Sequence, residues 1–248
     1  MSLLYNARLQ LRHGRLLLTA APIQYTANAD FDGGASINVN HVDVADQLQL
    51  DSKSEPFNFI WVACSGRGTV VKVDTITGTI LGEYRSAPDN RYGNPSRTTV
   101  DQDGSVWLTN RDDIGPNGRG TVVHIGLLEN NQCEDRNGQP GIQTSTGLGV
   151  IKPWADSSGT RNVGTAQDEC IVHYTEVNSL GSRHVSIDAD NNVWVSGFSL
   201  PNFDLVIGGK WDSPGSGTIK RSEPSVGFGG YGGLIDKKGF IWSAGSLL

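Results

Sequence analysis

The amino-acid sequence predicts an all-β fold made of repeated sheets of short strands. The first observation is a phrase repeated around four tryptophans, which reads FIWVACS, SVWLTNR, NVWVSGF and FIWSAGS in chain order. Successive tryptophans are 46, 87 and 48 residues apart, so a period of about 46–48 residues recurs and the middle interval holds extra chain. Repeats of this length with four short strands each are typical of the blades of a β-propeller.

Composition agrees with many strands joined by turns. Glycine accounts for 32 of 248 residues, and no stretch keeps the apolar rhythm of an amphipathic helix. The net charge of −6 is spread along the chain without a cluster of lysine and arginine, so we expect no nucleic acid as partner. No run of 18 apolar residues is present, so we expect no membrane insertion.

The repeats divide the chain into an extended lead-in at residues 1–45 and a propeller domain at residues 46–248. The first blade is expected to contain strands at 46–51, 57–65, 68–74 and 78–86. For the second we expect strands at 97–103, 105–111 and 120–128, an insert at 129–178, and an outer strand within that insert at 171–177. The third and fourth blades are expected to use 184–190, 192–198, 217–223, 232–238 and 240–246.

This count gives three blades plus two strands, which leaves two possibilities open. The chain is part of a larger ring and associates with itself through open blade faces. Alternatively, residues 15–20 (RLLLTA) and 35–41 (ASINVNH) close a four-bladed ring by completing the last blade.

Aspartates recur at the turn that precedes three of the tryptophans, in DQDG, DADN and DKKG. Paired carboxylates such as Asp101 and Asp103 resemble a metal or acid–base site. An aspartate in a hairpin turn, however, also accepts backbone amides, and the following Gly or Asn tolerates positive φ. We therefore interpret these aspartates as turn residues and the four tryptophans as core.

The phrases PSRTTVDQDGSVWLTNR, SRHVSIDADNNVWVSGF and GTVVKVDTITGTILGEY resemble the repeats of virginiamycin B lyase (streptogramin lyase)-like propellers and of secreted propellers with NHL- or YVTN-type blades. The resemblance covers roughly residues 46–128 and 180–248. It implies a general-base histidine and Mg²⁺ at the channel mouth, and His184 is the residue that matches by position. Val185 and Ser186 follow it where the lyases have glycine.

Internal repetition indicates where a ligand would bind. When the turn aspartates are aligned, Arg97, His184 and Gly232 occupy one equivalent position. Structural positions recur in every blade, whereas positions that face a ligand are free to differ. Arg97 and His184 are therefore candidate ligand-binding residues, and the alternative is that both are solvated loop residues.

The insert contains a candidate Ca²⁺ loop. Asp135, Asn137 and Gln139 have the alternating spacing of calcium ligands, and Asp168 and Glu169 could complete the site in space. The alternative is an ordinary Asx turn. Cys133 and Cys170 bracket the same insert and are predicted to form a disulfide, although two free thiols remain the alternative.

Two further tryptophans, Trp154 and Trp211, lie in loops rich in Gly, Ser and Asp. Such aromatics suit stacking on a sugar ring or a peptide, or they pack back onto the propeller. We therefore predict a secreted or cell-surface propeller, extracellular or periplasmic, that binds a small molecule, a carbohydrate or a peptide. The alternative is a metal-dependent lyase or a lactonase-like hydrolase acting at the central channel.

Overall fold

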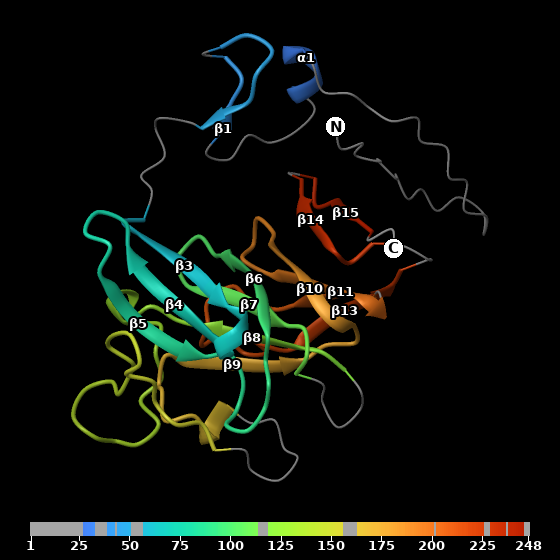
Figure 1. Cartoon of the computed structure of the whole chain (residues 1–248). Helices are drawn as coiled ribbons and strands as arrows, with labels where there is room; N and C mark the ends of the chain where they lie inside the picture. The colour runs from blue at the N-terminus through green and yellow to red at the C-terminus, as the bar shows by residue number, and fades with distance from the viewer. Residues whose placement is uncertain are drawn as a thin grey trace.

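The computed structural model describes residues 27–32, 39–42, 44–50, 57–113, 119–155, 163–200, 202–225, 229–236 and 238–245. The regular secondary structure of the described part is almost entirely antiparallel sheet, and within each sheet a strand pairs with the next one along the chain (Figure 1). The short helical segments are α1 (Asn28–Phe31), η1 (Ser65–Arg67), η2 (Leu128–Asn130) and η3 (Val163–Thr165). Among the described residues, no helix is long and apolar enough to cross a membrane.

Two of the sheets are four-stranded meanders. One contains β6 (Pro95–Val100), β7 (Val106–Asn110), β8 (Thr121–Ile125) and β9 (Ile171–Glu176). The other contains β10 (Leu180–Ile187), β11 (Val193–Leu200), β12 (Asn202–Val206) and β13 (Ile219–Pro224). Strand β9 confirms the outer strand expected after the insert, whereas β12 had not been predicted.

The remaining sheets are smaller. They contain β3 (Phe59–Cys64), β4 (Thr69–Asp74) and β5 (Ile80–Arg85), then β14 (Gly232–Ile235) with β15 (Ile241–Ala244), and β1 (Val39–Asn40) with β2 (Gln49–Leu50). The β4–β5 hairpin turns at Gly78, which has a φ of 72° as the TITG turn requires.

Successive sheets pack through their first strands. Strand β3 contacts β6, β6 contacts β10, and β10 contacts β14, and Figure 1 shows these sheets following one another in chain order. We call β3, β6, β10 and β14 the inner strands. Consecutive four-stranded meanders that pack in this way have a β-propeller-type arrangement, so the sequence prediction is confirmed at the level of fold class.

The first blade differs from the prediction. Strand β2 pairs with β1 and not with β3, so residues 46–51 do not form an inner strand of that blade. Residues 39–40, in the second segment expected to close a ring, likewise belong to this small sheet and do not extend β15. Leu48 is 52% exposed, so little apolar burial holds this segment against the propeller. Residues 15–20 lie outside the described residues.

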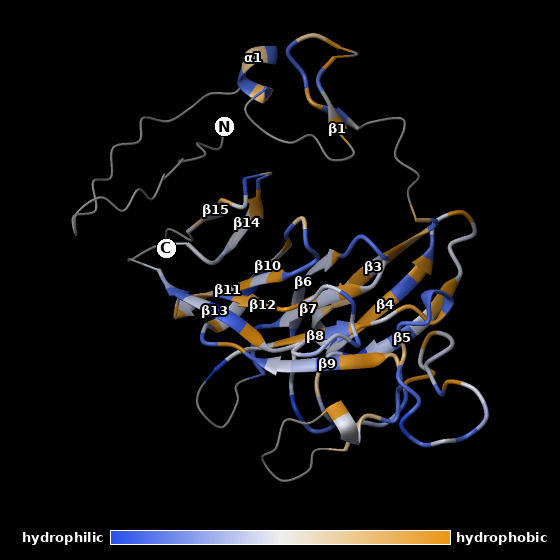
Figure 2. Ribbon diagram, turned by 180° about the vertical axis from the view of Figure 1, so that it is seen from behind, coloured by the Kyte–Doolittle hydropathy of each residue, from blue (hydrophilic) through white to orange (hydrophobic). Residues whose placement is uncertain are grey.

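The repeated tryptophans are mostly buried between sheets, as predicted. Trp107 is completely buried and Trp61 and Trp194 are each 7% exposed. Trp242 is partly buried on the two-stranded sheet. Hydrophobic residues follow the strands in Figure 2, whereas most loops are hydrophilic. Because Trp61 lies on β3 and its equivalents lie on β7, β11 and β15, β3 corresponds to the second strand of the other sheets.

The turn aspartates bind backbone, as predicted. Asp188 Oδ1 accepts the amides of Asp190 (2.9 Å) and Asn192 (2.8 Å), and Asp236 Oδ1 accepts two amides in the same way. Asp101 Oδ1 accepts the amides of Asp103 and Ser105. The positive φ falls on Gly104, Asn191 and Gly239, where the sequence offers Gly or Asn.

Candidate ligand-binding site

A groove of about 620 Å³ lies between the inner strands. Strands β3, β6, β10 and β14 all contribute lining residues, so the groove follows the axis about which the sheets are arranged. Among the described residues, the first blade has no strand equivalent to β6, and β3 therefore lines the groove directly.

The walls of the groove are mixed in character. Val62 on β3 and Leu234 on β14 are apolar and solvent-accessible, with 41% and 72% exposure. Ser96, Arg97 and Thr98 on β6 add polar groups. The lining is thus about evenly divided between apolar and polar residues, which makes it more polar than a typical small-molecule site.

Beside Arg97, which lines the groove, lie residues that differ from blade to blade. Two successive positions of the inner strands meet there, at four and five residues before the turn aspartate. The position at four residues holds Arg97, His184 and Gly232, and the position at five holds Ser96, Arg183 and Tyr231. Of these six residues only Ser96 and Arg97 line the groove itself, and we call the whole cluster the groove mouth.

Bulges place side chains at the mouth. The pairing of β6 with β7 shifts between Pro95 and Arg97, and the pairing of β10 with β11 shifts between Ser182 and His184. A bulge leaves one residue unpaired and turns its side chain away from the regular alternation. The unpaired residues are Ser96 and Arg183, which are equivalent in the repeat.

Arg97 lies next to Gly232, the residue at the equivalent position of β14. A β-carbon at Gly232 would lie 2.6 Å from Arg97 Nη1, so a larger residue at this position would displace the guanidinium. Arg97 and Arg183 both lie over the Tyr231 ring, with Cζ-to-centroid distances of 5.4 and 4.3 Å. Such stacking is favourable for a guanidinium.

His184 is completely buried beside the mouth. Its Nε2 shares a 2.9 Å hydrogen bond with Ser186 Oγ, and its ring packs edge-on against Phe203. Burial lowers the pKa of His184 to about 4, with the Arg97 charge acting in the same direction and the Gly232 backbone opposing it. At neutral pH this imidazole is uncharged.

The surroundings of His184 do not fit the Mg²⁺ that the lyase resemblance implies. A hard divalent cation needs oxygen ligands, including carboxylates, but Arg97 places positive charge beside the ring. Within the described residues, no group of three or more His, Cys, Asp and Glu side chains could hold a metal. We therefore derive no metal-dependent step at this position.

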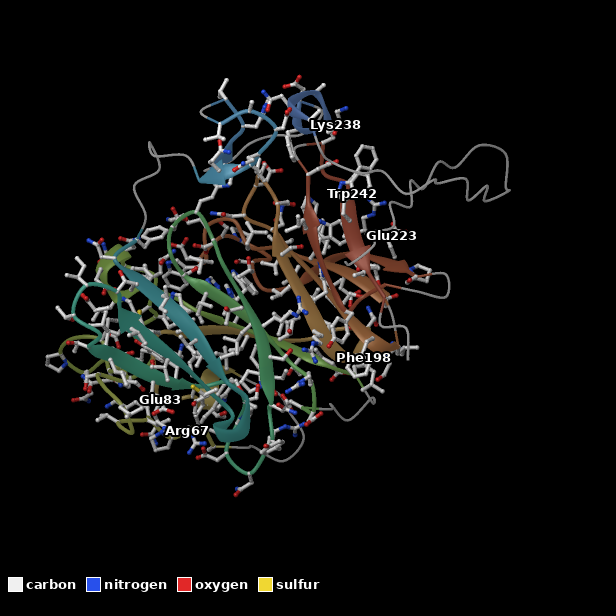
Figure 3. The ribbon with its side chains drawn as sticks, turned by 45° about the horizontal axis from the view of Figure 1, so that its top comes forward. Arg67, Glu83, Phe198, Glu223, Lys238 and Trp242 are labelled. Carbon is white, nitrogen blue, oxygen red and sulfur yellow. A yellow bond between two sulfur atoms is a disulfide. The ribbon has the colours of Figure 1, made fainter. Side chains whose placement is uncertain are left out.

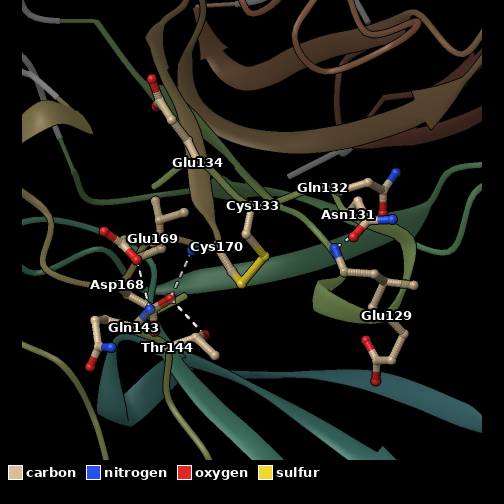
Figure 4. The surroundings of a disulfide bond; sticks show 12 residues. Glu129, Asn131, Gln132, Cys133, Glu134, Gln143, Thr144, Asp168, Glu169 and Cys170 are labelled. Atoms are coloured by element: carbon tan, nitrogen blue, oxygen red, sulfur yellow. Dashed lines mark hydrogen bonds between the residues drawn. A yellow bond between two sulfur atoms is a disulfide. The ribbon is translucent and has the colours of Figure 1, made fainter. Parts of the chain in front are cut away.

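The insert, in contrast, is held in place by a disulfide and by hydrogen bonds within the protein. Cys133 and Cys170 form a disulfide, the pair that the sequence favoured, and Cys64 is free. Figure 4 shows two buried carboxylates next to this disulfide. Asp168 accepts hydrogen bonds from Thr144 and Ser145, and Glu169 accepts the Gln143 amide at 2.6 Å.

The predicted calcium ligands take part in turns. Asp135 Oδ1 accepts the Gly138 amide at 2.8 Å, and Asn137 Oδ1 accepts the Gln139 amide at 2.7 Å. Of the two residues expected to complete the site, Glu169 lies at this loop, where its Oε1 accepts the amides of Arg136 (2.9 Å) and Asn137 (3.2 Å). These contacts are those of the Asx-turn alternative, and calcium binding stays a prediction.

The two loop tryptophans lie apart from the groove. Trp154 is completely buried and packs against Tyr174, with ring centroids 4.9 Å apart. It thus belongs to the core and offers no surface to a ligand, which corrects the stacking hypothesis for this residue. Trp211 is half-buried, and its Nε1 donates to the Asn131 carbonyl at 3.1 Å. Ligand binding by Trp211 stays a prediction.

Three residues of the mouth were not identified from the sequence, namely Arg183, Tyr231 and Arg111. Arg111 follows β7 and bonds to Asn94 through Nη2 at 2.6 Å. Arg183 and Tyr231 could have been found from the aligned repeat, because each lies one residue before the position shared by Arg97, His184 and Gly232. Arg111 carried no comparable signal.

Comparisons with known proteins assign this chain to no family. No family model matches the chain, and no curated protein matches its sequence. Among solved structures, the PQQ-bound aldose sugar dehydrogenase from Streptomyces coelicolor is similar at 14% identity and a TM-score of 0.25, over 75% of this chain and 71% of that one. A TM-score this low does not establish a shared fold. The propeller-type assignment depends on the strand pairing of this chain.

Proposed function

We propose that the chain is a secreted or cell-surface propeller that binds a ligand in the groove between its inner strands. One observation carries the proposal. Positions that repeat from blade to blade form the core and the turns, whereas unlike residues gather around Arg97 at the side of an accessible groove. Its volume of about 620 Å³ lies within the range of about 300–1,000 Å³ typical of small-molecule sites.

The disulfide supports the proposed location. Disulfides persist in oxidising compartments and are rare in the cytosol. A Cys133–Cys170 bond that closes a long surface insert therefore fits an extracellular or periplasmic protein.

The test is a thermal-shift screen of small molecules, oligosaccharides and peptides. Ligands of the groove should stabilise the wild-type protein and lose their effect on Leu234→Trp, which fills the groove from an exposed position. Leu148→Trp is the matched control, because Leu148 is 54% exposed and lies on the insert. Ligands that stabilise both variants equally would place binding elsewhere and reject the proposal.

The enzymatic alternative requires a general base within reach of a substrate. The described residues offer His184, but its side chain has no exposed surface. We therefore expect no linearisation of a streptogramin B antibiotic in the presence of Mg²⁺. Turnover that disappears in His184→Ala would reverse this preference and establish a lyase.

A further inference from the structure

We infer that the groove mouth recognises an anionic group, a carboxylate or a phosphate, through Arg97, Arg183 and Arg111. This inference adds the chemistry of the ligand to the proposed function, and it depends on that function only in assigning a role to the groove. The three arginines are distant in the sequence and come from two different sheets, at β6, β7 and β10.

The charges at the mouth are not balanced by the protein. Within the described residues, none of the three guanidiniums has a carboxylate partner in an ion pair. Arg111 bonds instead to Asn94, whose amide donates to the exposed Asp112 carboxylate at 2.5 Å. Burial lowers the pKa of Arg183, and the charges of Arg111 and Arg97 lower it further, while Tyr231 opposes the shift. Three like charges at one place favour a bound anion.

Unpartnered polar atoms at the same place point to a ligand. Ser96 Oγ and Arg183 Nε are buried and lack a hydrogen-bond partner. Buried polar groups are nearly always paired, by protein, water or a bound molecule. Ser96 and Arg183 are the two residues that the bulges leave unpaired, so the backbone irregularity and the unsatisfied atoms coincide.

The mouth is also shaped for a flat group. Tyr231 holds the Arg97 and Arg183 guanidiniums by stacking, which leaves their N–H edges to bind an anion in a bidentate manner. The Phe198 ring, at the end of the β10–β13 sheet in Figure 3, packs edge-on against Tyr231 at 6.2 Å. With Val62 and Leu234 further along the groove, the site fits an acid that carries an apolar body.

The experiment uses inorganic phosphate and citrate as probes, titrated at constant ionic strength into protein labelled with ¹⁵N. We expect the Nε–Hε signals of Arg97 and Arg183 to shift in a saturable manner. Hydrogen bonds to charged groups contribute about 1.5–3 kcal/mol, so Arg183→Gln and Arg97→Gln should each weaken binding about tenfold or more. Preference for citrate identifies a carboxylate ligand, and preference for phosphate a phosphorylated one.

The chain provides a matched control in Arg221. This arginine also lies over an aromatic ring, that of Trp194, but it has a carboxylate partner, Glu223, at 2.6 Å. Arg221→Gln should leave binding unchanged. Arg183→Lys keeps the charge without the planar fork and should bind less tightly than wild type, which separates recognition from a general charge effect.

Two results would overturn the inference. Either neither anion shifts the two arginine signals, or Arg221→Gln weakens binding as much as Arg183→Gln. Failure of the groove itself is distinguishable, because Leu234→Trp fills the groove away from the arginines. If ligands from the screen stabilise Leu234→Trp as much as wild type while phosphate still shifts the Arg183 Nε–Hε signal, the groove proposal fails and the anion site stands.

Discussion

At one end of β6, β10 and β14 the chain repeats itself, and at the other end it does not. The turn end holds aspartates at equivalent positions, each of which accepts backbone amides of its own turn. The mouth end holds unlike residues, of which Ser96 and Arg183 each have a buried atom without a partner. The same strands thus satisfy their polar groups at one end and leave them unsatisfied at the other.

The difference teaches which positions are constrained by folding. A blade cannot form its hairpin without the turn, so the same side chain recurs wherever the turn recurs. The mouth residues are not needed to pair strands, and unsatisfied polar groups there reduce stability. Stability lost at one place in a fold is a recognised sign of function.

Removal of the disulfide should have the largest effect on stability. The disulfide lies at the turn end of the sheet, where the chain leaves β8 for the insert and returns to β9. The cysteines are 37 residues apart, so closing this loop contributes about 4 kcal/mol by chain entropy. We expect the Cys133→Ser/Cys170→Ser variant to lose about that much in urea unfolding, and Cys64→Ser to lose far less. Thiol titration of unfolded, non-reduced protein should find one free thiol, and three would contradict the pairing.

Acid should destabilise the mouth end through His184. Its pKa of about 4 in the folded protein lies below the ordinary value of 6.5, so the unfolded chain takes up a proton first as pH falls. The contribution of His184 to the free energy of unfolding should therefore be fully present above pH 6.5. It should decline by about 3 kcal/mol as the pH falls from 6.5 to 4.

The variant His184→Gln removes this titration. Its free energy of unfolding, measured in urea across the same pH range, should fall less steeply than that of wild type. Burial also lowers the pKa values of His124 and His173, so a residual slope is expected. Parallel slopes for wild type and variant would contradict the assignment to His184.

Matched substitutions at the two ends of β6 test the comparison directly. Asp101 is 4% exposed and accepts the amides of Asp103 and Ser105. Asp101→Ala leaves these donors unsatisfied and should cost about 2 kcal/mol. Arg97→Ala should change stability by less than about 0.5 kcal/mol. Equal losses in urea unfolding at pH 7 would mean that the mouth is as structural as the turn.

The repeated tryptophans and turn aspartates allowed most strands to be predicted, because both positions are fixed by local pairing and by burial between sheets. In the first blade, β3, β4 and β5 confirm the strands predicted at 57–65, 68–74 and 78–86, and only the inner strand predicted at 46–51 is wrong. The alternating segment at 46–51 has the pattern of a strand, but Leu48 stays 52% exposed there. Periodicity does not say which sheet a strand joins.

The candidate site was only partly predictable. The repeat identified Arg97 and His184, whereas charge along the sequence argued that no arginine cluster exists. Arg97, Arg111 and Arg183 come together only because neighbouring sheets converge at the mouth. A charge cluster formed by strands from different blades leaves no run in the sequence, so composition alone cannot reveal it.

The smallest effect is expected for calcium at the insert. Asp135 and Asn137 are exposed, and their Oδ1 atoms already accept backbone amides. A calcium ion would have to compete with those bonds and would gain only one carboxylate among the three predicted ligands. We therefore expect the melting temperature to be the same in EDTA and in Ca²⁺. A melting temperature that falls in EDTA, returns with Ca²⁺ and does not respond in Asp135→Ala would establish the site. The insert would then join the groove mouth as a second place where the chain leaves ligand positions for a bound species.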